Sequence, residues 1–246
     1  MITKNQIKYI CSLHLKKNRD THNCFVVEGE KIVNELLRSD FNVKAIFATK
    51  DWIQSVKKAI EIHIISEKDL KRISALKSPN KVVAIAEIPK RDLEISLIKK
   101  GLTLVLDNIK NPGNLGTIIR VCDWFGVENI ICSNPSVELY NPKVIQATTG
   151  SFLRVNVYYT DIEKVIKELP DNFPIYGAFM DGKNISALDL EENALLVMGN
   201  ESLGISTKLS ELISEKIGIR SEKTGIESLN VAIATSILLY EFKRED

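Results

Sequence analysis

Two hydrophobic patterns divide the chain near residue 100. Before it, short apolar runs typical of strands alternate with stretches at helical spacing. Ile7, Ile10, Cys11 and His14 recur every three or four residues and predict an opening helix, followed by a turn at residues 18–20. Together these elements predict a small α/β domain. Its strands are expected at residues 24–27, 43–48, 62–65 and 82–88, and its second helix at residues 31–38.

From about residue 101, apolar strands alternate with amphipathic helices. Continuous apolar strands separated by helices predict a mostly parallel sheet that is covered on both faces. Such sheets bind ligands beyond the carboxyl ends of their strands, so functional residues are expected there. The expected strands cover residues 102–106, 129–132, 175–179, 195–198 and 216–219, and the expected helices cover residues 115–125, 142–147, 162–169 and 229–242.

A polar stretch that contains a proline, residues 87–92, separates the two patterns. It predicts a first domain (1–90), a linker (91–100) and a second domain (101–246). The net charge of +1 is unevenly divided, because residues 1–90 hold 17 Lys and Arg against 10 Asp and Glu, whereas the remainder is acidic. The first domain is therefore a candidate surface for a polyanion, although ordinary solvated lysines account for the same excess equally well.

Composition narrows the class of protein further. Apolar residues make up 44% of the chain and charged residues 26%, as in globular proteins. No apolar run is long enough to span a bilayer, and the first residues lack a signal-peptide core. The four cysteines form no CxxC pair, which favours a reducing compartment over a disulfide framework or a zinc site. We expect a cytoplasmic protein with neither a membrane segment nor a metal.

The first candidate site, residues 107–116, leaves an expected strand and enters a helix. Pro112-Gly113 predicts a tight turn, and Asn114 is positioned to cap the helix with its side-chain oxygen. Arg120 is expected in the second turn of that helix, from which its side chain reaches toward the strand ends. Taken alone, these residues fit a capped helix with a surface arginine better than a reactive site.

Two further candidate sites lie in the second half. Residues 197–206 form a glycine-bounded loop that resembles a phosphate-binding loop, but Ile205 stands where that loop needs lysine, and no GxGxxG sequence occurs. Residues 225–230 precede the last helix, and Ser228 occupies the expected N-cap, where free backbone N–H groups suit an anionic or polar ligand. Packing or capping alone also accounts for each of these two sites.

Together and in this order, the three sites resemble the SpoU (TrmH-type) RNA 2′-O-methyltransferases of the SPOUT superfamily. The resemblance extends to the first domain, which is similar to the substrate-binding domain of many members, and so covers nearly the whole chain. The matching pieces are Asn111-Pro-Gly-Asn-Leu-Gly with Arg120 and Phe125-Gly126, Ala147-Thr-Thr-Gly-Ser with Arg154, Gly199-Asn-Glu with Gly204-Ile-Ser, Glu227-Ser-Leu-Asn, and, in the first domain, Arg19 and Phe25-Val-Val-Glu-Gly29.

The resemblance implies an α/β fold in which the mostly parallel sheet carries a C-terminal trefoil knot and follows a smaller α/β RNA-binding domain. It implies S-adenosylmethionine as the cofactor, RNA as the substrate (ribosomal more than transfer RNA) and a homodimer. Carried over by position, the catalytic residues are Arg120, Asn114, Ser228, Asn230 and Glu201, and the cofactor contacts are Gly199, Asn200, Ile219, Ser228 and Leu229. The expected RNA contacts are Lys16, Lys17, Arg19 and Arg154.

Two departures from the family pattern concern the cofactor loop. Members usually have proline after the isoleucine that corresponds to Ile219, whereas this chain has Arg220. The segment from residue 219 to residue 227 is also one residue longer than the common pattern. These departures support the alternative of a non-catalytic RNA-binding or ribosome-assembly protein that retains the fold.

Methyl transfer to a ribose requires a way to activate the hydroxyl. The three histidines all lie in the first domain, and the resemblance assigns the activation to Arg120. Because a guanidinium stays protonated at ordinary pH, we favour Arg120 as a cation that binds RNA phosphate and stabilises developing negative charge. Glu201 is either a helper in this step or a residue that orders its loop. A transfer-RNA 2′-O-methyltransferase stays open as an alternative, and a generic nucleotide-dependent enzyme is disfavoured by the absent glycine and lysine motifs.

Overall fold

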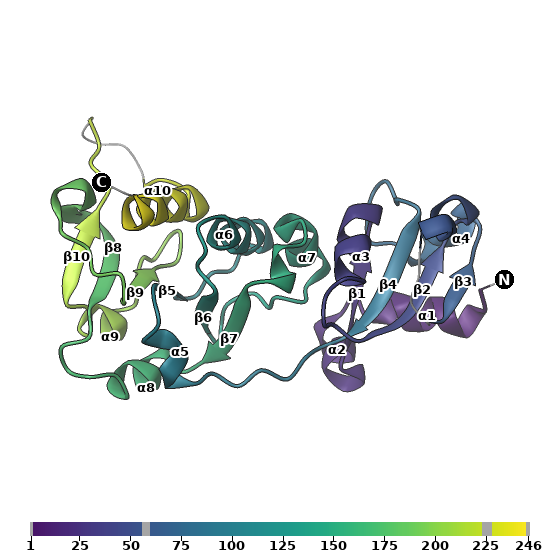
Figure 1. Cartoon of the computed structure of the whole chain (residues 1–246), viewed down its shortest axis with the longest axis horizontal. Helices are drawn as coiled ribbons and strands as arrows, with labels where there is room; N and C mark the ends of the chain where they lie inside the picture. Colours follow the sequence, from purple (N-terminus) through teal and green to yellow (C-terminus); the bar gives the residue numbers. More distant parts are fainter. Residues whose placement is uncertain (1, 56–59, 223–227, 245–246) are drawn as a thin grey trace. The chain divides into compact units, whose positions relative to one another are not determined.

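The computed structural model describes residues 2–55, 60–222 and 228–244, and the chain divides into two compact units (Figure 1). The N-terminal unit consists of Met1–Lys90 together with Glu138–Leu153, and the C-terminal unit consists of Arg91–Val137 and Arg154–Asp246. The predicted domains differ from these units, because a segment from the second half of the chain belongs to the N-terminal unit.

The N-terminal unit is built on a four-stranded sheet in the order β1-β4-β2-β3. β4 pairs antiparallel with both β1 and β2, and β3 pairs parallel with β2 at the edge. The strands are β1 (Cys24–Glu28), β2 (Val43–Ala48), β3 (Ile62–Ile64) and β4 (Val82–Glu87), and the helices are α1 (Lys4–Ser12), α2 (Lys16–His22), α3 (Glu30–Leu36), the 3₁₀ segment η1 (Lys50–Ser55) and α4 (Glu67–Ile73).

The turn expected at residues 18–20 is wrong, because these residues lie inside α2. The helix begins after Leu15 and ends at Asn23, which takes the left-handed conformation with φ 51°. Arg19 drives this arrangement: its side chain is buried, donates to the carbonyl of Leu13 and forms an ion pair with Glu138. The residues around Arg19 are mostly polar, so this helix shows no apolar periodicity in the sequence.

Residues 138–153 are part of the N-terminal core. α7 (Pro142–Thr148) packs against β1, and the short 3₁₀ segment η2 (Ser151–Leu153) carries the fully buried Phe152. The rings of Phe152 and Phe25 lie 5.9 Å apart, Phe152 and Phe41 5.8 Å, and Phe25 and Tyr140 4.5 Å. Such aromatic packing adds to the hydrophobic burial, so the N-terminal unit depends on a segment far downstream of β1 in the sequence.

The C-terminal unit is built on a six-stranded sheet in the order β10-β8-β9-β5-β6-β7, in which every pairing is parallel. The predicted mostly parallel α/β fold is therefore confirmed. The strands are β5 (Thr103–Leu106), β6 (Asn129–Ser133), β7 (Asn156–Thr160), β8 (Ile175–Asn184), β9 (Leu195–Met198) and β10 (Glu215–Gly218), and the helices are α5 (Ile95–Ile98), α6 (Pro112–Trp124), α8 (Ile162–Lys167), η3 (Ile185–Ala187), α9 (Thr207–Ser210) and α10 (Val231–Lys243).

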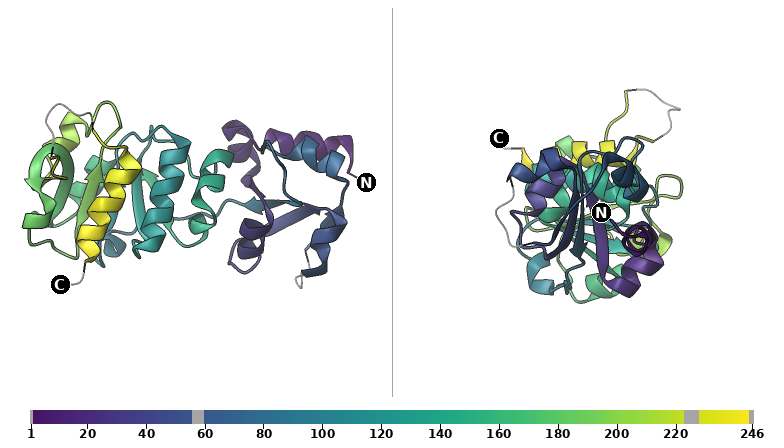
Figure 2. Two further views of the ribbon diagram at one scale, coloured as in Figure 1. Left: turned by 90° about the horizontal axis from the view of Figure 1, so that it is seen from above. Right: turned by 90° about the vertical axis from the view of Figure 1, so that its right-hand side faces the viewer.

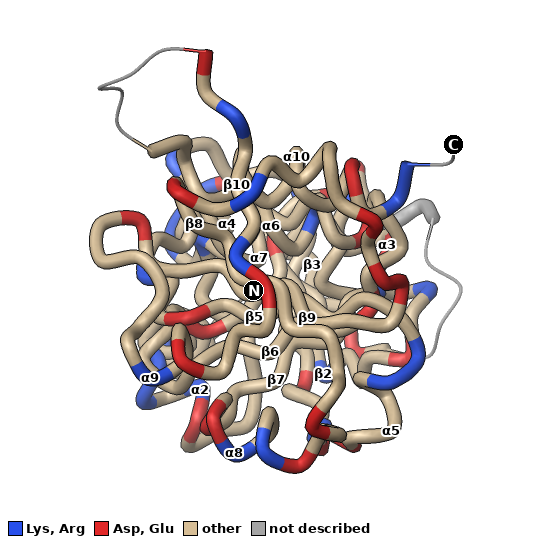
Figure 3. The backbone as a smooth tube through the Cα atoms, turned by 90° about the vertical axis from the view of Figure 1, so that its left-hand side faces the viewer, with Lys and Arg blue, Asp and Glu red and all other residues tan. Residues whose placement is uncertain are grey.

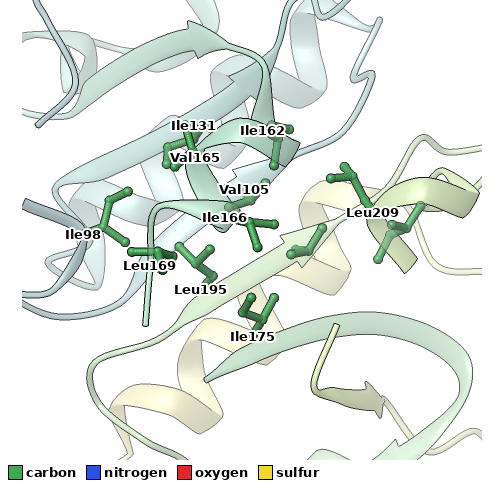
Figure 4. Close-up of a cluster of buried hydrophobic side chains, with 12 residues drawn as sticks. Ile98, Val105, Ile131, Ile162, Val165, Ile166, Leu169, Ile175, Leu195 and Leu209 are labelled. Carbon is green, nitrogen blue, oxygen red and sulfur yellow. The ribbon is translucent and has the colours of Figure 1, made fainter. Parts of the chain in front are cut away.

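Helices cover both faces of this sheet. On one face α5, α8 and α9 enclose a cluster of buried side chains that includes Val105, Ile131 and Ile166 (Figure 4). On the other face α6 and α10 pack side by side (Figure 2). Ile98 of α5 is fully buried in the first of these cores, so part of the stretch expected as a linker is an integral element of the unit.

The four cysteines are free thiols in the structure. Cys24, Cys122 and Cys132 are buried, Cys11 is partly buried, and all four are free. Burial raises the pKa of the Cys122 and Cys132 thiols, so both stay protonated as small apolar groups.

Among the described residues, no helix has the length and hydropathy needed to cross a bilayer.

We predict that Phe152→Ala lowers the free energy of unfolding of the N-terminal unit by about 3–5 kcal/mol, the usual cost of deleting a buried phenylalanine. Hydrogen exchange of the full chain should show faster exchange in β1 and little change in β9. The matched control is Ile64→Ala on β3, where the side chain is 50% exposed and the cost should stay below about 1 kcal/mol. The core shared by the N-terminal sheet and residues 138–153 is called the composite core below. Unchanged exchange in β1 would contradict it.

Candidate active site

The three candidate sites meet at one edge of the parallel sheet. β5 leads into α6, β9 leads into the loop from Gly199 to Ser206, and β10 leads toward the start of α10. Because all these strands run parallel, the segments that follow them leave from the same edge, where open α/β sheets bind their ligands.

One side chain from each site joins a continuous chain of hydrogen bonds. Asn114 Nδ2 donates to Glu201 Oε1 at 2.6 Å, and Asn230 Nδ2 donates to Asn114 Oδ1 at 3.1 Å. Asn230 Oδ1 in turn accepts from the backbone N–H of Ala232 at 2.9 Å. Asn114 thus uses both ends of its amide, and three of the five predicted catalytic residues are brought into direct contact.

The helix caps differ from those expected. Asn111, not Asn114, caps α6: its side-chain oxygen accepts from the N–H of Gly113 at 2.8 Å, and Pro112 occupies the first helical position, where its missing N–H costs nothing. Likewise Asn230, not Ser228, caps α10. The cap of α6 lies three residues earlier than predicted, which leaves the Asn114 amide available to Glu201 and Asn230.

The loop after β9 is a tight, internally bonded turn. Asn200 and Gly204 exchange backbone hydrogen bonds at 3.0 and 2.9 Å, and Asn200 Oδ1 accepts from the N–H groups of Ser202 and Leu203. Gly199 is required here, because a Cβ at this position would lie 2.2 Å from the carbonyl carbon of Gly204. The Asn200 side chain holds the loop in shape, and its predicted contact with the cofactor stays a prediction.

Two residues at the start of the first candidate site, to which the sequence assigned no role of their own, fasten this loop to the end of β5. The buried carboxylate of Asp107 accepts from the N–H of Ser206 at 2.9 Å, and the carbonyl of Asn108 accepts from Asn200 Nδ2 at 2.9 Å. Asn108 has φ 59°, a left-handed conformation that asparagine tolerates better than most residues. In the sequence, the only sign of this role is the position of the Asp-Asn pair directly after a predicted strand.

A pocket of about 950 Å³ opens beside the loop. Its volume lies within the range of small-molecule and cofactor sites. Its inner wall is formed by the buried apolar side chains of Met198, Ile205, Ile217 and Leu238. The pocket is also lined by all five predicted cofactor contacts and by Glu201; the five are Gly199, Asn200, Ile219, Ser228 and Leu229.

Glycines let the backbone segments around the pocket approach one another closely. β8 and β10 pair at Lys216 with Gly177 and then, after a register shift, at Ile217 with Lys183, so residues 178–182 bulge out toward the pocket. A Cβ at Gly182 would lie 2.3 Å from the carbonyl carbon of Ile217. This crossing exposes backbone groups to the pocket, which suits a cofactor bound largely through backbone atoms.

Arg120 lies in the third turn of α6, not in the second, because the helix begins at Pro112. Its side chain is exposed, makes no hydrogen bond or ion pair with the described part of the chain, and does not line the pocket. Arg120 is therefore free to bind a group brought by a substrate.

The predicted RNA contacts are placed differently from one another. Lys16 and Lys17 are exposed in the first turn of α2. Arg19 is 1% exposed and ion-paired with Glu138, so the prediction that it contacts RNA phosphate is wrong: its guanidinium holds residues 138–153 to α2. Arg154 forms a two-point ion pair with Asp123, with N–O distances of 2.9 and 2.7 Å. Along the backbone tube of Figure 3, basic and acidic positions are interspersed.

Of the two departures from the family pattern at the cofactor loop, Arg220 lies within the described residues. Arg220 lines the pocket and lies 3.7 Å from Glu222, with both side chains largely exposed. The predicted insertion and the first residues of the third site, Gly225, Ile226 and Glu227, lie outside the described residues.

Comparison with known proteins decides the family. The model of the SpoU rRNA methylase family matches residues 101–240, and the model of the MRM3-like substrate-binding domain matches residues 4–84. The chain belongs to the SpoU rRNA methylase family. The resemblance predicted from the ordered motifs is thereby confirmed for more than half of the sequence.

Individual relatives of this SpoU protein cover nearly its whole length. It is 29% identical to the 23S rRNA (guanosine(2553)-2′-O)-methyltransferase of Bacillus subtilis, over 98% of this chain and 97% of the relative. A TrmH-family structure from Porphyromonas gingivalis superposes with a TM-score of 0.90 at 34% identity, covering 99% of this chain and 98% of the other. An rRNA methyltransferase from Sinorhizobium meliloti, solved with S-adenosylmethionine bound, gives 0.84 at 26% identity over 98% and 95%.

We predict that Gly199→Ala weakens binding of S-adenosylhomocysteine at least tenfold, measured by calorimetry, because the new methyl group displaces the backbone of Gly204. The matched control is Gly126→Ala, where φ is also positive at 68° but no atom lies within 4 Å of the new Cβ. Gly126→Ala should cost about 1 kcal/mol of stability and leave ligand affinity unchanged. Equal affinity in both variants would contradict the close packing assigned to this loop.

Proposed function

We propose that this protein is an S-adenosylmethionine-dependent 2′-O-methyltransferase of ribosomal RNA. The observation that carries the proposal is the hydrogen-bond chain Glu201–Asn114–Asn230 beside a pocket lined by every predicted cofactor contact. Membership of the SpoU rRNA methylase family, the 23S rRNA activity of the Bacillus subtilis relative and the bound S-adenosylmethionine in the Sinorhizobium meliloti structure support it. A transfer-RNA substrate is the alternative that mapping of ribose methylation would test.

The cofactor supplies an electrophilic methyl group on a sulfonium, and the pocket residues fit its mixed character. The apolar side chains of the inner wall would hold the nucleoside face of the cofactor, and Gly199, Gly218 and Ile219, which also line the pocket, would hold its polar edges. Ser228 and Leu229 are exposed at its rim. The trefoil knot that the family implies stays a prediction for this chain.

The hydrogen-bond chain positions the ribose. Glu201 fixes the orientation of the Asn114 amide, and Asn114 in turn fixes Asn230. The N-terminal ends of α6 and α10 are joined by this contact, and helix N-termini stabilise negative charge. A ribose oxygen that gains negative charge during attack on the methyl group is therefore stabilised by oriented amides and two helix ends, and alignment of the bound reactants supplies much of the acceleration.

Arg120 provides the cation for this step. Its exposed guanidinium, without a partner among the described residues, binds a phosphate next to the target ribose and lowers the energy of the developing oxyanion. The guanidinium keeps its proton at ordinary pH, so the hydroxyl proton passes to another group, and the acceptor we propose is a phosphate oxygen of the RNA. Arg120 thus acts as a charge stabiliser and not as a general base.

The N-terminal unit holds the RNA. Lys16 and Lys17 are exposed on α2 and neutralise phosphates, which orients the RNA without reading its sequence. Deleting residues 1–90 is not a clean test of this role, because it would also strip the partners from Tyr140 and Phe152. Substitution of the lysines leaves the composite core intact.

A homodimer completes the proposal. Trp124 of α6 is 84% exposed, and Ile233 and Tyr240 of the adjacent α10 are 52% and 55% exposed. Large apolar side chains gathered on two packed helices are typical of a surface that another protein covers. A cytoplasmic location also belongs to the proposal, because ribosomal RNA and the cofactor are both found there.

We predict that Arg120→Ala lowers the rate of methyl transfer by at least a hundredfold, in line with the loss of one preorganised oxyanion stabiliser, while the Kd for S-adenosylhomocysteine changes less than twofold. Rates come from transfer of labelled methyl to rRNA isolated from a strain without the gene. Arg120→Lys, which keeps the charge but not the two-pronged geometry, should recover part of the rate. Turnover of Arg120→Ala close to that of the wild type would reject the assignment, and an absence of ligand binding by the wild type would favour the non-catalytic alternative.

We predict that Lys16→Ala with Lys17→Ala weakens RNA binding and makes its dependence on salt shallower, because about two counterions fewer are released. The measurement is the slope of log Kd against log salt by filter binding. The matched control is Lys44→Ala, whose ammonium is already paired with Glu87 at 2.8 Å and should contribute little. A slope identical in wild type and double variant would place the RNA elsewhere.

A further inference from the structure

Exposed apolar side chains gather at the mouth of the cofactor pocket. Met180 is 72% exposed, Leu203 79% and Leu229 50%, and all three line this pocket. They come from three separate segments: the bulge of β8, the loop after β9 and the approach to α10. Single exposed leucines are common on protein surfaces, but three apolar side chains that converge on one opening mark a binding surface.

Leu203 is held outward by the most tightly bonded turn of the site. Its own N–H and that of Ser202 donate to Asn200 Oδ1, and the backbones of Asn200 and Gly204 are paired in both directions. The adjacent Glu201 is fixed to Asn114. The side chain of Leu203 therefore projects into solvent from a rigid support, two residues from the proposed catalytic chain of hydrogen bonds, and gains nothing from the protein's own core.

The inner and outer parts of the pocket differ in burial, which suits the inner part to the cofactor and the outer part to the target nucleotide. The inner apolar wall, which includes Ile205, Ile217 and Leu238, is buried and suits the cofactor, whereas Met180 and Leu203 are exposed at the rim and are not among the predicted cofactor contacts. In the proposed reaction the ribose hydroxyl contacts the amides and the phosphate contacts Arg120. The nucleobase is the remaining part of the target nucleotide, and its faces are apolar.

We propose that Leu203, together with Met180, forms a platform for the nucleobase of the nucleotide to be methylated. This inference rests on the proposed function and names a contact within it. A base turned out of its stack loses stacking energy, and apolar side chains in the receiving site recover part of it. Because a leucine face contacts all four bases equally, the platform favours an unstacked nucleotide and does not select its identity.

The test uses the full-length chain, labelled S-adenosylmethionine and rRNA from a strain without the gene. Leu203→Ala is expected to lower kcat/KM for RNA about tenfold with less than a twofold change in the Kd for S-adenosylhomocysteine. Leu203→Met, which keeps an apolar side chain of similar size, should stay within twofold of the wild type, and Leu203→Asn, of similar size but polar, should resemble Leu203→Ala. Ile64→Ala on β3 removes another exposed apolar side chain, at 50%, away from the pocket and should leave all constants unchanged.

Each contrary result points to a different error. A parallel loss of S-adenosylhomocysteine binding in Leu203→Ala would assign the side chain to the cofactor, and a lower sedimentation coefficient of Leu203→Ala than of the wild type would assign it to a subunit contact. Unchanged kcat/KM in Leu203→Ala and Leu203→Asn would leave the platform without a role. A wild-type protein that binds rRNA but transfers no methyl group would instead overturn the proposed function on which the platform rests.

Discussion

The parallel direction of all six strands in the C-terminal unit is the constraint on which the site depends. Because of it, the segments after β5, β9 and β10 all leave the sheet at the same edge. Asn114 and Glu201 can therefore meet there, although they lie 87 positions apart in the sequence. Direct hydrogen bonds among side chains on these segments then need only short loops. A single antiparallel strand at this position would carry one of the three partners to the opposite edge.

The loop after β9 is fixed from two directions, and this division of roles accounts for its composition. Internal bonds of Asn200 set its shape, while Asp107 and Asn108 set its place against β5. The left-handed backbone of Asn108 is a small local cost that persists because the neighbouring bonds determine it. The loop can therefore offer backbone groups and the Glu201 carboxylate to ligands without first having to be ordered by them.

The sequence predicted the parallel sheet well, because continuous apolar strands between amphipathic helices are typical of this fold class and rare outside it. It missed β7, whose residues Asn156–Thr160 mix polar and aromatic side chains as an edge strand does. It also misplaced both helix caps by two or three residues, because asparagine and serine are both competent caps and each helix start has more than one of them nearby. Arg19 was misread for a different reason: a buried ion pair to Glu138 depends on a contact 119 residues away, which no local pattern records. The ordered motifs, in contrast, identified the residues that line the pocket, because their spacing reflects strand ends.

The composite core of the N-terminal unit has a consequence for how the polypeptide is made. β1 to β4 leave the ribosome first, yet the ring of Phe152 and the carboxylate of Glu138 that complete their packing are synthesised only after β6. The nascent N-terminal sheet must therefore wait, with Phe25 incompletely covered, for about sixty further residues beyond Lys90. Chaperone contact during this interval, and sensitivity of the yield to translation speed between β4 and η2, follow from the order in which the chain is built.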